Sequence, residues 1–266
     1  MKKSIKVLGL SLALAPLVML TACGGEQLGS KPNLDVNNAG SYSTATAEDF
    51  NQVAYDETTH DVKSDFAAYK IGLTMKGQDS KSGNGEVSFV GIFKVTEEKT
   101  EYAYSSYVNA EGVNAKIKYY VPGDGYCYAD ANIKGSIEGF DTSMDGKYKI
   151  DAKDVYGMFD EVSAAELANG YSYANILSMV EGFKGEGITI EKAERESKVN
   201  YKFTVAATEY SPELAIYFFY EDGKIVACQY EASAADASLK ITIEAFDGEI
   251  EYPDFSSYKA FLPSLG

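Results

Sequence analysis

Residues 67–76, Ala-Ala-Tyr-Lys-Ile-Gly-Leu-Thr-Met-Lys, decide the fold, because apolar side chains stand at every second position from Ala67 to Met75. Successive side chains of a β-strand point to opposite faces, so this alternation predicts a strand that is buried on one face. Nine more segments carry a strand-like pattern, and they are residues 87–95, 102–108, 116–121, 126–133, 188–196, 199–205, 214–220, 226–230 and 239–245. The chain is therefore predicted to form two groups of five strands.

Short turns rich in glycine and aspartate join these segments. Pro122-Gly123-Asp124-Gly125 precedes the fifth strand, and Asp222-Gly223 is the dipeptide typical of a two-residue hairpin. Tight turns connect antiparallel neighbours, so each group of strands is predicted to be an antiparallel meander.

Two other regions have a helical period. A helix is predicted to begin near Thr46, which can act as the N-cap residue, with Phe50 on its apolar face. In residues 152–183 apolar residues recur at intervals of three and four, beginning with Val155 and Met158, which predicts a helical insert. Runs of strands with the helices kept apart from them predict an α+β fold.

The N-terminus has the layout of an export signal. Lysines within residues 2–6 precede an apolar run from Val7 to Leu20, which is too short to span a bilayer. The run closes on Leu20-Thr21-Ala22-Cys23, which resembles the lipobox of bacterial lipoproteins. The resemblance implies cleavage before Cys23, a diacylglycerol on its thiol, an acyl chain such as palmitate on its new amine, and a place on the extracytoplasmic face of the cell membrane. Two acyl chains give stable anchoring, because each buried methylene contributes ~0.8 kcal/mol.

The chain is accordingly divided into four parts. Residues 1–22 are interpreted as the signal peptide, and residues 23–45, which show no apolar period, as a flexible tether with an r.m.s. reach of roughly 25 Å. Residues 46–258 are expected to form one folded domain, and residues 259–266 a C-terminal tail.

The charge balance bears on the choice of partner. The full chain has a net charge of −16, and loss of residues 1–22 would leave 21 basic against 40 acidic residues. Such a chain repels nucleic acid, so no nucleic-acid partner is expected.

Few residues carry the chemistry that catalysis or metal binding needs. His60, the only histidine, lies in a polar segment without a nucleophile motif, so it is interpreted as a surface or capping residue. Residues 141–146 resemble the start of a calcium-binding loop, but Ala152 stands where a bidentate glutamate is needed. Cys127 and Cys228 lie in apolar strands and are interpreted as buried free thiols, with a disulfide between them as the alternative. We therefore expect no enzyme, no cofactor and no metal.

The order helix, five strands, helices, five strands resembles the LolA-like lipoproteins, including the LppX/LprG type, over about residues 46–258. The ending Glu249-Ile250-Glu251-Tyr252-Pro253 is similar to that of such domains. The resemblance implies an antiparallel half-barrel of about 10–11 strands with helices packed on its concave face, and an acyl chain bound between sheet and helices.

The candidate ligand-binding residues follow from this resemblance and from the abundance of tyrosine, which joins an apolar ring to a hydroxyl. They are Tyr69, Leu73, Phe89, Tyr102, Tyr104, Tyr119, Phe159, Leu177, Tyr201 and Tyr217. The other interpretation of the tyrosines is that they fill a β-core or stand on its outer surface. The leading hypothesis is a non-enzymatic lipoprotein that binds a lipid or another apolar ligand, and the alternative is a packed scaffold that binds a protein partner or host molecule at the cell surface.

Overall fold

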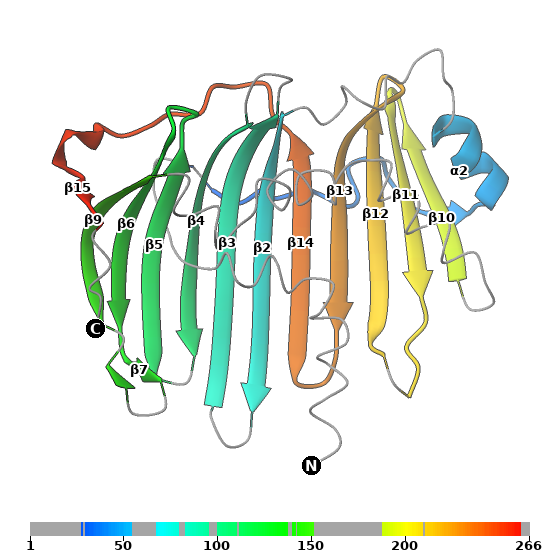
Figure 1. The fold of residues 1–266 in the computed structure, drawn as a ribbon. Coiled ribbons are helices and arrows are strands. Elements are labelled where there is room, and N and C mark those ends of the chain that lie inside the picture. The colour runs from blue at the N-terminus through cyan, green and yellow to red at the C-terminus, as the bar shows by residue number, and fades with distance from the viewer. Residues whose placement is uncertain are drawn as a thin grey trace.

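The computed structural model describes residues 28, 30–54, 68–79, 83–95, 100–110, 112–137, 140–141, 143–151, 188–209 and 211–261. Within them one broad sheet of thirteen strands dominates (Figure 1), in the order β1-β10-β11-β12-β13-β14-β2-β3-β4-β5-β6-β9-β15. All of its pairs are antiparallel except β15 with β9. Its strands are β1 (Ser43–Thr44), β2 (Ala68–Asp79), β3 (Gly83–Val95), β4 (Thr100–Ala110), β5 (Val113–Val121), β6 (Tyr126–Lys134), β9 (Met144–Asp151), β10 (Ile188–Arg195), β11 (Lys198–Val205), β12 (Glu213–Glu221), β13 (Lys224–Ser233), β14 (Ala237–Ala245) and β15 (Lys259–Ala260).

The prediction of an α+β fold with helices on a concave face was wrong. Strands hold 66 % of the described residues and helices hold 5 %. The one α-helix among them, α2 (Ala47–Ala54), lies beside β10 at one side of the sheet (Figure 1). The helical insert predicted over residues 152–183 lies outside the described residues. The two predicted meanders join directly through β14 and β2, which pair from Ala237↔Gly77 to Ala245↔Tyr69.

All ten predicted strands are present, whereas the predicted total of about 10–11 was too low. The sequence interpretation missed β9, the short edge strands β1 and β15, and the small separate hairpin of β7 (Ser136–Ile137) and β8 (Phe140–Asp141). The hairpin turn at Asp222-Gly223 is confirmed, since both residues have positive φ, 51° and 76°. Two positive φ values in succession are what a type I′ turn requires.

The predicted start of the first helix is also confirmed. Thr46 precedes α2, and its hydroxyl accepts a hydrogen bond from the backbone N–H of Asp49 (3.2 Å). The Asp49 carboxylate in turn accepts one from the backbone N–H of Thr46 (2.8 Å), which closes a capping box. This cap fixes where the chain turns from the sheet edge into the helix.

The first face of the sheet, here the core face, carries the main hydrophobic core. Side chains from β11 to β14 and from β2 to β4 pack there, and Phe50 of α2 joins them. Its ring lies edge-on to Tyr201 (5.2 Å between centroids) and Phe203 (4.8 Å). Phe50 therefore ties the helix to the core.

The opposite face, here the strap face, is crossed by two segments. The N-terminal strap (residues 30–42) packs Leu34, Val36 and Tyr42 against Tyr217 and Phe219 of β12. Farther back along the strap, Lys31 donates to the hydroxyls of Thr74 (2.7 Å) and Ser88 (2.8 Å) on β2 and β3.

The expected flexible tether is therefore wrong for residues 30–45. Besides the contacts of the strap, the Asn200 side-chain amide donates to Asn38 Oδ1 (2.7 Å), and Ser43–Thr44 pair with β10. Leu28 is 3 % exposed. Polar composition alone suggested a solvated coil, but backbone pairing and a few apolar contacts hold this segment on the sheet.

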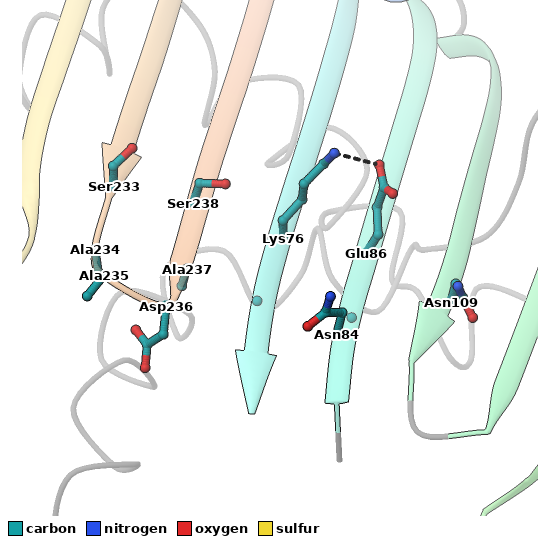
Figure 2. A pocket seen from close by; sticks show the side chains of 12 residues that line it. Lys76, Asn84, Glu86, Asn109, Ser233, Ala234, Ala235, Asp236, Ala237 and Ser238 are labelled. Atoms are coloured by element: carbon teal, nitrogen blue, oxygen red, sulfur yellow. Dashed lines mark ion pairs between the residues drawn. The ribbon is translucent and has the colours of Figure 1, made fainter. Parts of the chain in front are cut away.

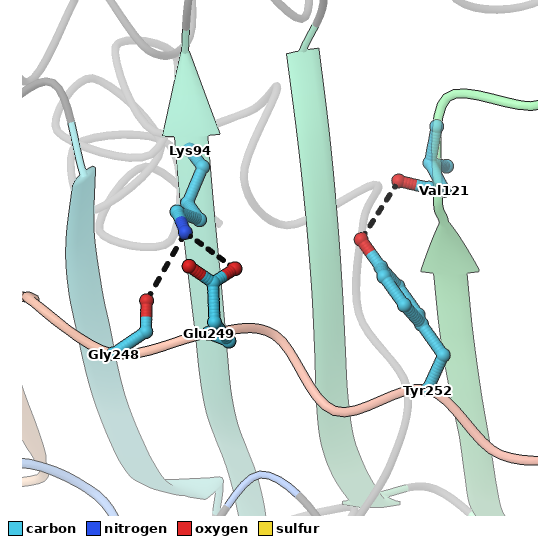
Figure 3. A network of polar contacts seen from close by, with 5 residues as sticks. All are labelled: Lys94, Val121, Gly248, Glu249 and Tyr252. Atoms are coloured by element: carbon cyan, nitrogen blue, oxygen red, sulfur yellow. Dashed lines mark hydrogen bonds and ion pairs between the residues drawn. The ribbon is translucent and has the colours of Figure 1, made fainter.

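The C-terminal strap (residues 246–261) crosses the other half of the same face. Phe255 stacks on Tyr128 at 3.7 Å between ring centroids, in the 3₁₀ helix η2 (Phe255–Ser257). Lys94 donates to the backbone carbonyl of Gly248 (3.1 Å) and pairs with the Glu249 carboxylate (2.8 Å). Tyr252 donates to the carbonyl oxygen of Val121 (3.3 Å), as Figure 3 shows. Part of the predicted tail, Lys259–Ala260, is strand β15.

No helix in the described part of the chain has the length and the apolar composition to cross a membrane.

Candidate ligand pocket on the strap face

The structure gathers five of the predicted ligand residues into one aromatic stack on the core face. Tyr69, Phe89, Tyr102, Tyr104 and Tyr119 lie there together with Phe93, which was not among the predicted ligand residues. Neighbouring rings are 5.3 to 6.5 Å apart between centroids, and most pairs are stacked. Leu73 and Tyr201 lie on the same face.

Part of this stack belongs to the buried core, and Phe93, Tyr102 and Tyr119 are partly buried against it. Tyr69, Leu73, Phe89 and Tyr201 are at most 5 % exposed, and Tyr104 is 8 % exposed. Burial raises the pKa of the Tyr104 and Tyr119 hydroxyls, so both stay protonated at neutral pH. These positions match the interpretation in which tyrosines fill a β-core.

The other predicted residues lie elsewhere. Tyr217 is buried on the strap face, where its ring stacks with Phe219 at 6.4 Å between centroids. Phe159, Leu177 and Cys23 lie outside the described residues, as does His60. Cys127 and Cys228 are buried free thiols, as interpreted from the sequence.

A cavity of about 620 Å³ lies on the strap face, between the N-terminal strap and the start of the C-terminal strap. We call it the strap pocket. Its lining consists of Leu34, Asn38, Ala68, Phe219, Glu221, Val226, Ala227, Glu244, Ala245, Phe246 and Asp247. Functional pockets for small molecules typically measure 300–1,000 Å³ and combine apolar walls with a few polar groups, and the strap pocket meets both conditions.

Each wall of the strap pocket has a local cause. A β-bulge between Phe219 and Tyr220 shifts the pairing of β12 with β13 and leaves Val226 outside the regular ladder. The N-terminal strap supplies Leu34 and Asn38, and Asn200 holds the strap there through its bonds to Asn38 and the Val36 carbonyl. Where β14 ends, the chain turns across the sheet and brings Phe246 to the opposite wall.

The electrostatics of the strap pocket are acidic. Glu221, Glu244 and Asp247 line it, and its lining holds no lysine or arginine. Burial raises the pKa of Glu244, while the positive charge of Lys70, its cross-strand neighbour on β2, lowers it. Lys198 lies 3.5 Å from the Glu221 carboxylate.

A second cavity of about 470 Å³ lies at the opposite ends of the strands, where β2 ends and β3 and β14 begin (Figure 2). Ser233, Ser238, Lys76, Glu86 and Asn109 form one row across five strands from β13 to β4, each opposite the next in register. Lys76 and Glu86 pair with each other at 3.6 Å and are largely exposed. Apart from three alanines and two glycines the lining of this groove is polar, whereas the strap pocket has the larger side chains of Leu34, Phe219 and Phe246, so the strap pocket is the better candidate for an amphipathic ligand.

The described residues do not present a cluster of metal ligands. They contain no histidine, and no group of three or more Cys, Asp or Glu side chains among them could hold a metal ion. The strap pocket offers a ligand apolar contact, hydrogen bonding and negative charge.

Sequence reasoning missed the strap pocket, although one signal for it was available. Residues 214–220, Leu-Ala-Ile-Tyr-Phe-Phe-Tyr, are apolar or aromatic at every position. A continuous run of this kind is typical of a strand that is buried on both faces. It indicates that something covers the strap face of β12, but it does not say that Leu34 and Phe246 do so.

Comparisons with known proteins do not identify a family. No family model and no curated protein matches the chain. Rv2717c from M. tuberculosis is 6 % identical, with 69 % of this chain and 94 % of that chain covered and a TM-score of 0.21. A beta-barrel-like protein of a domain of unknown function from Brucella abortus is 10 % identical, with 68 % and 98 % covered and a TM-score of 0.19. The S-type phycobiliprotein lyase CPES from Guillardia theta is 5 % identical, with 77 % and 100 % covered and a TM-score of 0.17. Scores this low carry no argument about fold or function, and the LolA-like resemblance stays a prediction.

Proposed function

We propose that this protein is a non-enzymatic lipoprotein, anchored on the extracytoplasmic face of the cell membrane, that binds an amphipathic small molecule in the strap pocket. The observation that carries the proposal is the pocket itself, about 620 Å³ of space with apolar side chains on its walls and carboxylates beside them. It replaces the predicted site between sheet and helices.

The position of Leu28 supports a short distance between the domain and its membrane. Leu28 is buried against the strap face, packed with Val90, Ile92 and Tyr120. It stands five residues after Cys23, and five residues span at most about 18 Å. A lipid on Cys23 would therefore hold the folded domain closer to the bilayer than a free tether of residues 23–45 would.

The binding proposal can be tested with a tryptophan reporter, because the chain has no tryptophan of its own. Phe246→Trp places one in the pocket lining, and Phe261→Trp places one on an exposed side chain outside it. We would titrate residues 23–266, carrying Cys23→Ser, with a bacterial lipid extract in mixed micelles. The expected result is a saturable emission shift for Phe246→Trp and none for Phe261→Trp.

A blocking variant locates the binding. Ala68 lines the pocket and alternates along β2 in step with Gly72, which faces the N-terminal strap, so Ala68→Phe should fill part of the space and weaken binding, whereas Ala206→Phe, in the exposed segment after β11, should not. Equal responses of both reporters, or binding that Ala68→Phe leaves intact, would reject the pocket as the ligand site. Absence of any bound lipid would favour the packed scaffold that binds a protein partner.

The anchoring half of the proposal has a separate test. The full chain expressed in a bacterium should sediment with membranes and yield an N-terminal peptide whose mass includes the lipid on Cys23. Cys23→Ala should abolish both results, and a soluble, unmodified mature protein would contradict the anchor.

A further inference from the structure

The charges around the strap pocket bear on which amphipathic molecule it takes. Two of its three carboxylates, Glu244 and Asp247, form no ion pair within the described part of the chain. Glu221 has its partner, Lys198, on β11 outside the lining. The space inside the pocket thus faces negative charge on one side and apolar side chains on the other.

Glu244 is the carboxylate of the strap pocket whose charged form is disfavoured by burial. It is the penultimate residue of β14 and stands directly opposite Lys70, yet the ion pairs of the described residues do not include these two side chains. Partial burial removes water from the carboxylate, and this desolvation raises its pKa. A cation in the pocket would replace the lost hydration and favour the ionised form, whereas an anion there would meet like charge.

We infer that the strap pocket selects molecules that carry an amine on an apolar chain. The ammonium group would lie beside the unpaired carboxylates of Glu244 and Asp247, and the chain along Leu34, Phe219 and Phe246. The inference rests on the proposed function, because it names the ligand class of the same pocket. An amine-bearing lipid and a free long-chain amine share this chemistry.

Three probes with eight carbon atoms each separate charge from apolar contact: octylamine, octanol and octanoate. Each is titrated into residues 23–266 carrying Cys23→Ser and the Phe246→Trp reporter. We expect octylamine to bind roughly tenfold more tightly than octanol, and octanoate to bind most weakly. Added salt should weaken the binding of octylamine and leave that of octanol nearly unchanged, because only the first includes a charge interaction.

Variants assign the preference to particular carboxylates. Glu244→Gln with Asp247→Asn should bring octylamine to within about twofold of octanol, while Glu213→Gln, at an exposed position on β12 outside the pocket, should keep the tenfold preference. Asp247 is an exposed loop residue, so Asp247→Asn alone replaces the double variant in this titration if the double variant does not fold. Repeating the titration with vesicles of an amine-headed phospholipid then tells a lipid ligand from a free amine.

The outcomes separate the two claims. If octanol binds as tightly as octylamine, or if Glu244→Gln with Asp247→Asn keeps the preference, the amine inference is overturned and the pocket remains a binding site. If none of the three probes and no lipid extract shifts the Phe246→Trp emission, both the inference and the proposed binding function fail.

Discussion

Two glycines on the same strand test whether the N-terminal strap lies in contact with the sheet. Gly72 and Gly77 both stand inside β2. A Cβ atom added at Gly72 would meet Pro32 Cδ at 2.8 Å and Lys31 Cβ at 3.1 Å, whereas one added at Gly77 would meet nothing within 4 Å. Gly72→Ala and Gly77→Ala therefore differ in the strap contact and share the chemical change.

The expected magnitude follows from two opposing terms. In a strand interior, alanine stabilises relative to glycine by roughly 0.5–1 kcal/mol, because glycine loses more backbone entropy on folding. Overpacking at Gly72 costs about 1–3 kcal/mol, since Pro32 must move or the strand must distort. The entropy term is common to both variants, so their free energies of unfolding should differ by about 1–3 kcal/mol, with Gly77→Ala the more stable.

Urea unfolding followed by circular dichroism measures this difference as a shift in midpoint at unchanged slope. Hydrogen exchange over residues 30–42 is the second readout, and Gly72→Ala should lower protection there if the strap gives way. Equal midpoints together with equal strap protection in Gly72→Ala and Gly77→Ala would refute the packed strap and restore a free tether.

Three further predictions concern the core, the pocket carboxylate and the thiols. Phe50→Ala should lower the free energy of unfolding in urea by about 3–5 kcal/mol, because it empties a buried aromatic site. Phe261→Ala, at a side chain that is 42 % exposed, should change the free energy of unfolding by less than about 0.5 kcal/mol. Equal effects of the two substitutions would contradict docking of α2 on the core face. The pKa of Glu244 in the folded protein is raised above 4.5, so its contribution to stability is full below pH 4.5 and is lost as the pH rises through the folded pKa. Glu244→Gln should therefore be more stable than the parent protein at neutral pH and equal to it below pH 4.5. Unfolding curves at several pH values check this, and a gain that persists at low pH would argue against it. Burial also raises the thiol pKa of Cys127 and Cys228, so a thiol reagent should react with neither in the native Cys23→Ser protein and with both after denaturation; fast native labelling would show that the core is open.

The strands were readable from the sequence because alternation is a local signal. The same signal exists for β9, where Met144, Tyr148 and Ile150 alternate with charged residues, but the first half of this strand overlaps residues 141–146, which have the composition of a turn. Edge strands β1 and β15 span two residues each, too few for any period. Their existence depends on partners distant in the sequence, which no local pattern encodes.

The candidate site was not predictable in the same way, since it forms where distant segments meet. Tyrosines on the core face were chosen because the ligand was expected on the apolar side of a half-barrel, and there the rings pack on one another instead. The strap pocket needs a bulge in β12, an N-terminal segment lying across it and the exit of the chain from β14. These three features depend on contacts between segments distant in the sequence. In the sequence only the continuous apolar run of residues 214–220 indicates that a segment covers the strap face.

The straps also change what an anchor at Cys23 would do. A free tether lets a domain take any orientation. Here the N-terminal strap is bound to the sheet from Lys31 to Tyr42, so the chain toward Cys23 leaves the domain on the side of the strap face. Leu28 is buried on that face, and because it follows Cys23 by five residues, the two residues are at most about 18 Å apart. Leu28 belongs to a buried cluster over β3, β5 and β6, so Cys23 stays within that distance of this part of the strap face. An acyl chain on Cys23 would thus hold the strap pocket near the bilayer, where amphipathic molecules are most concentrated.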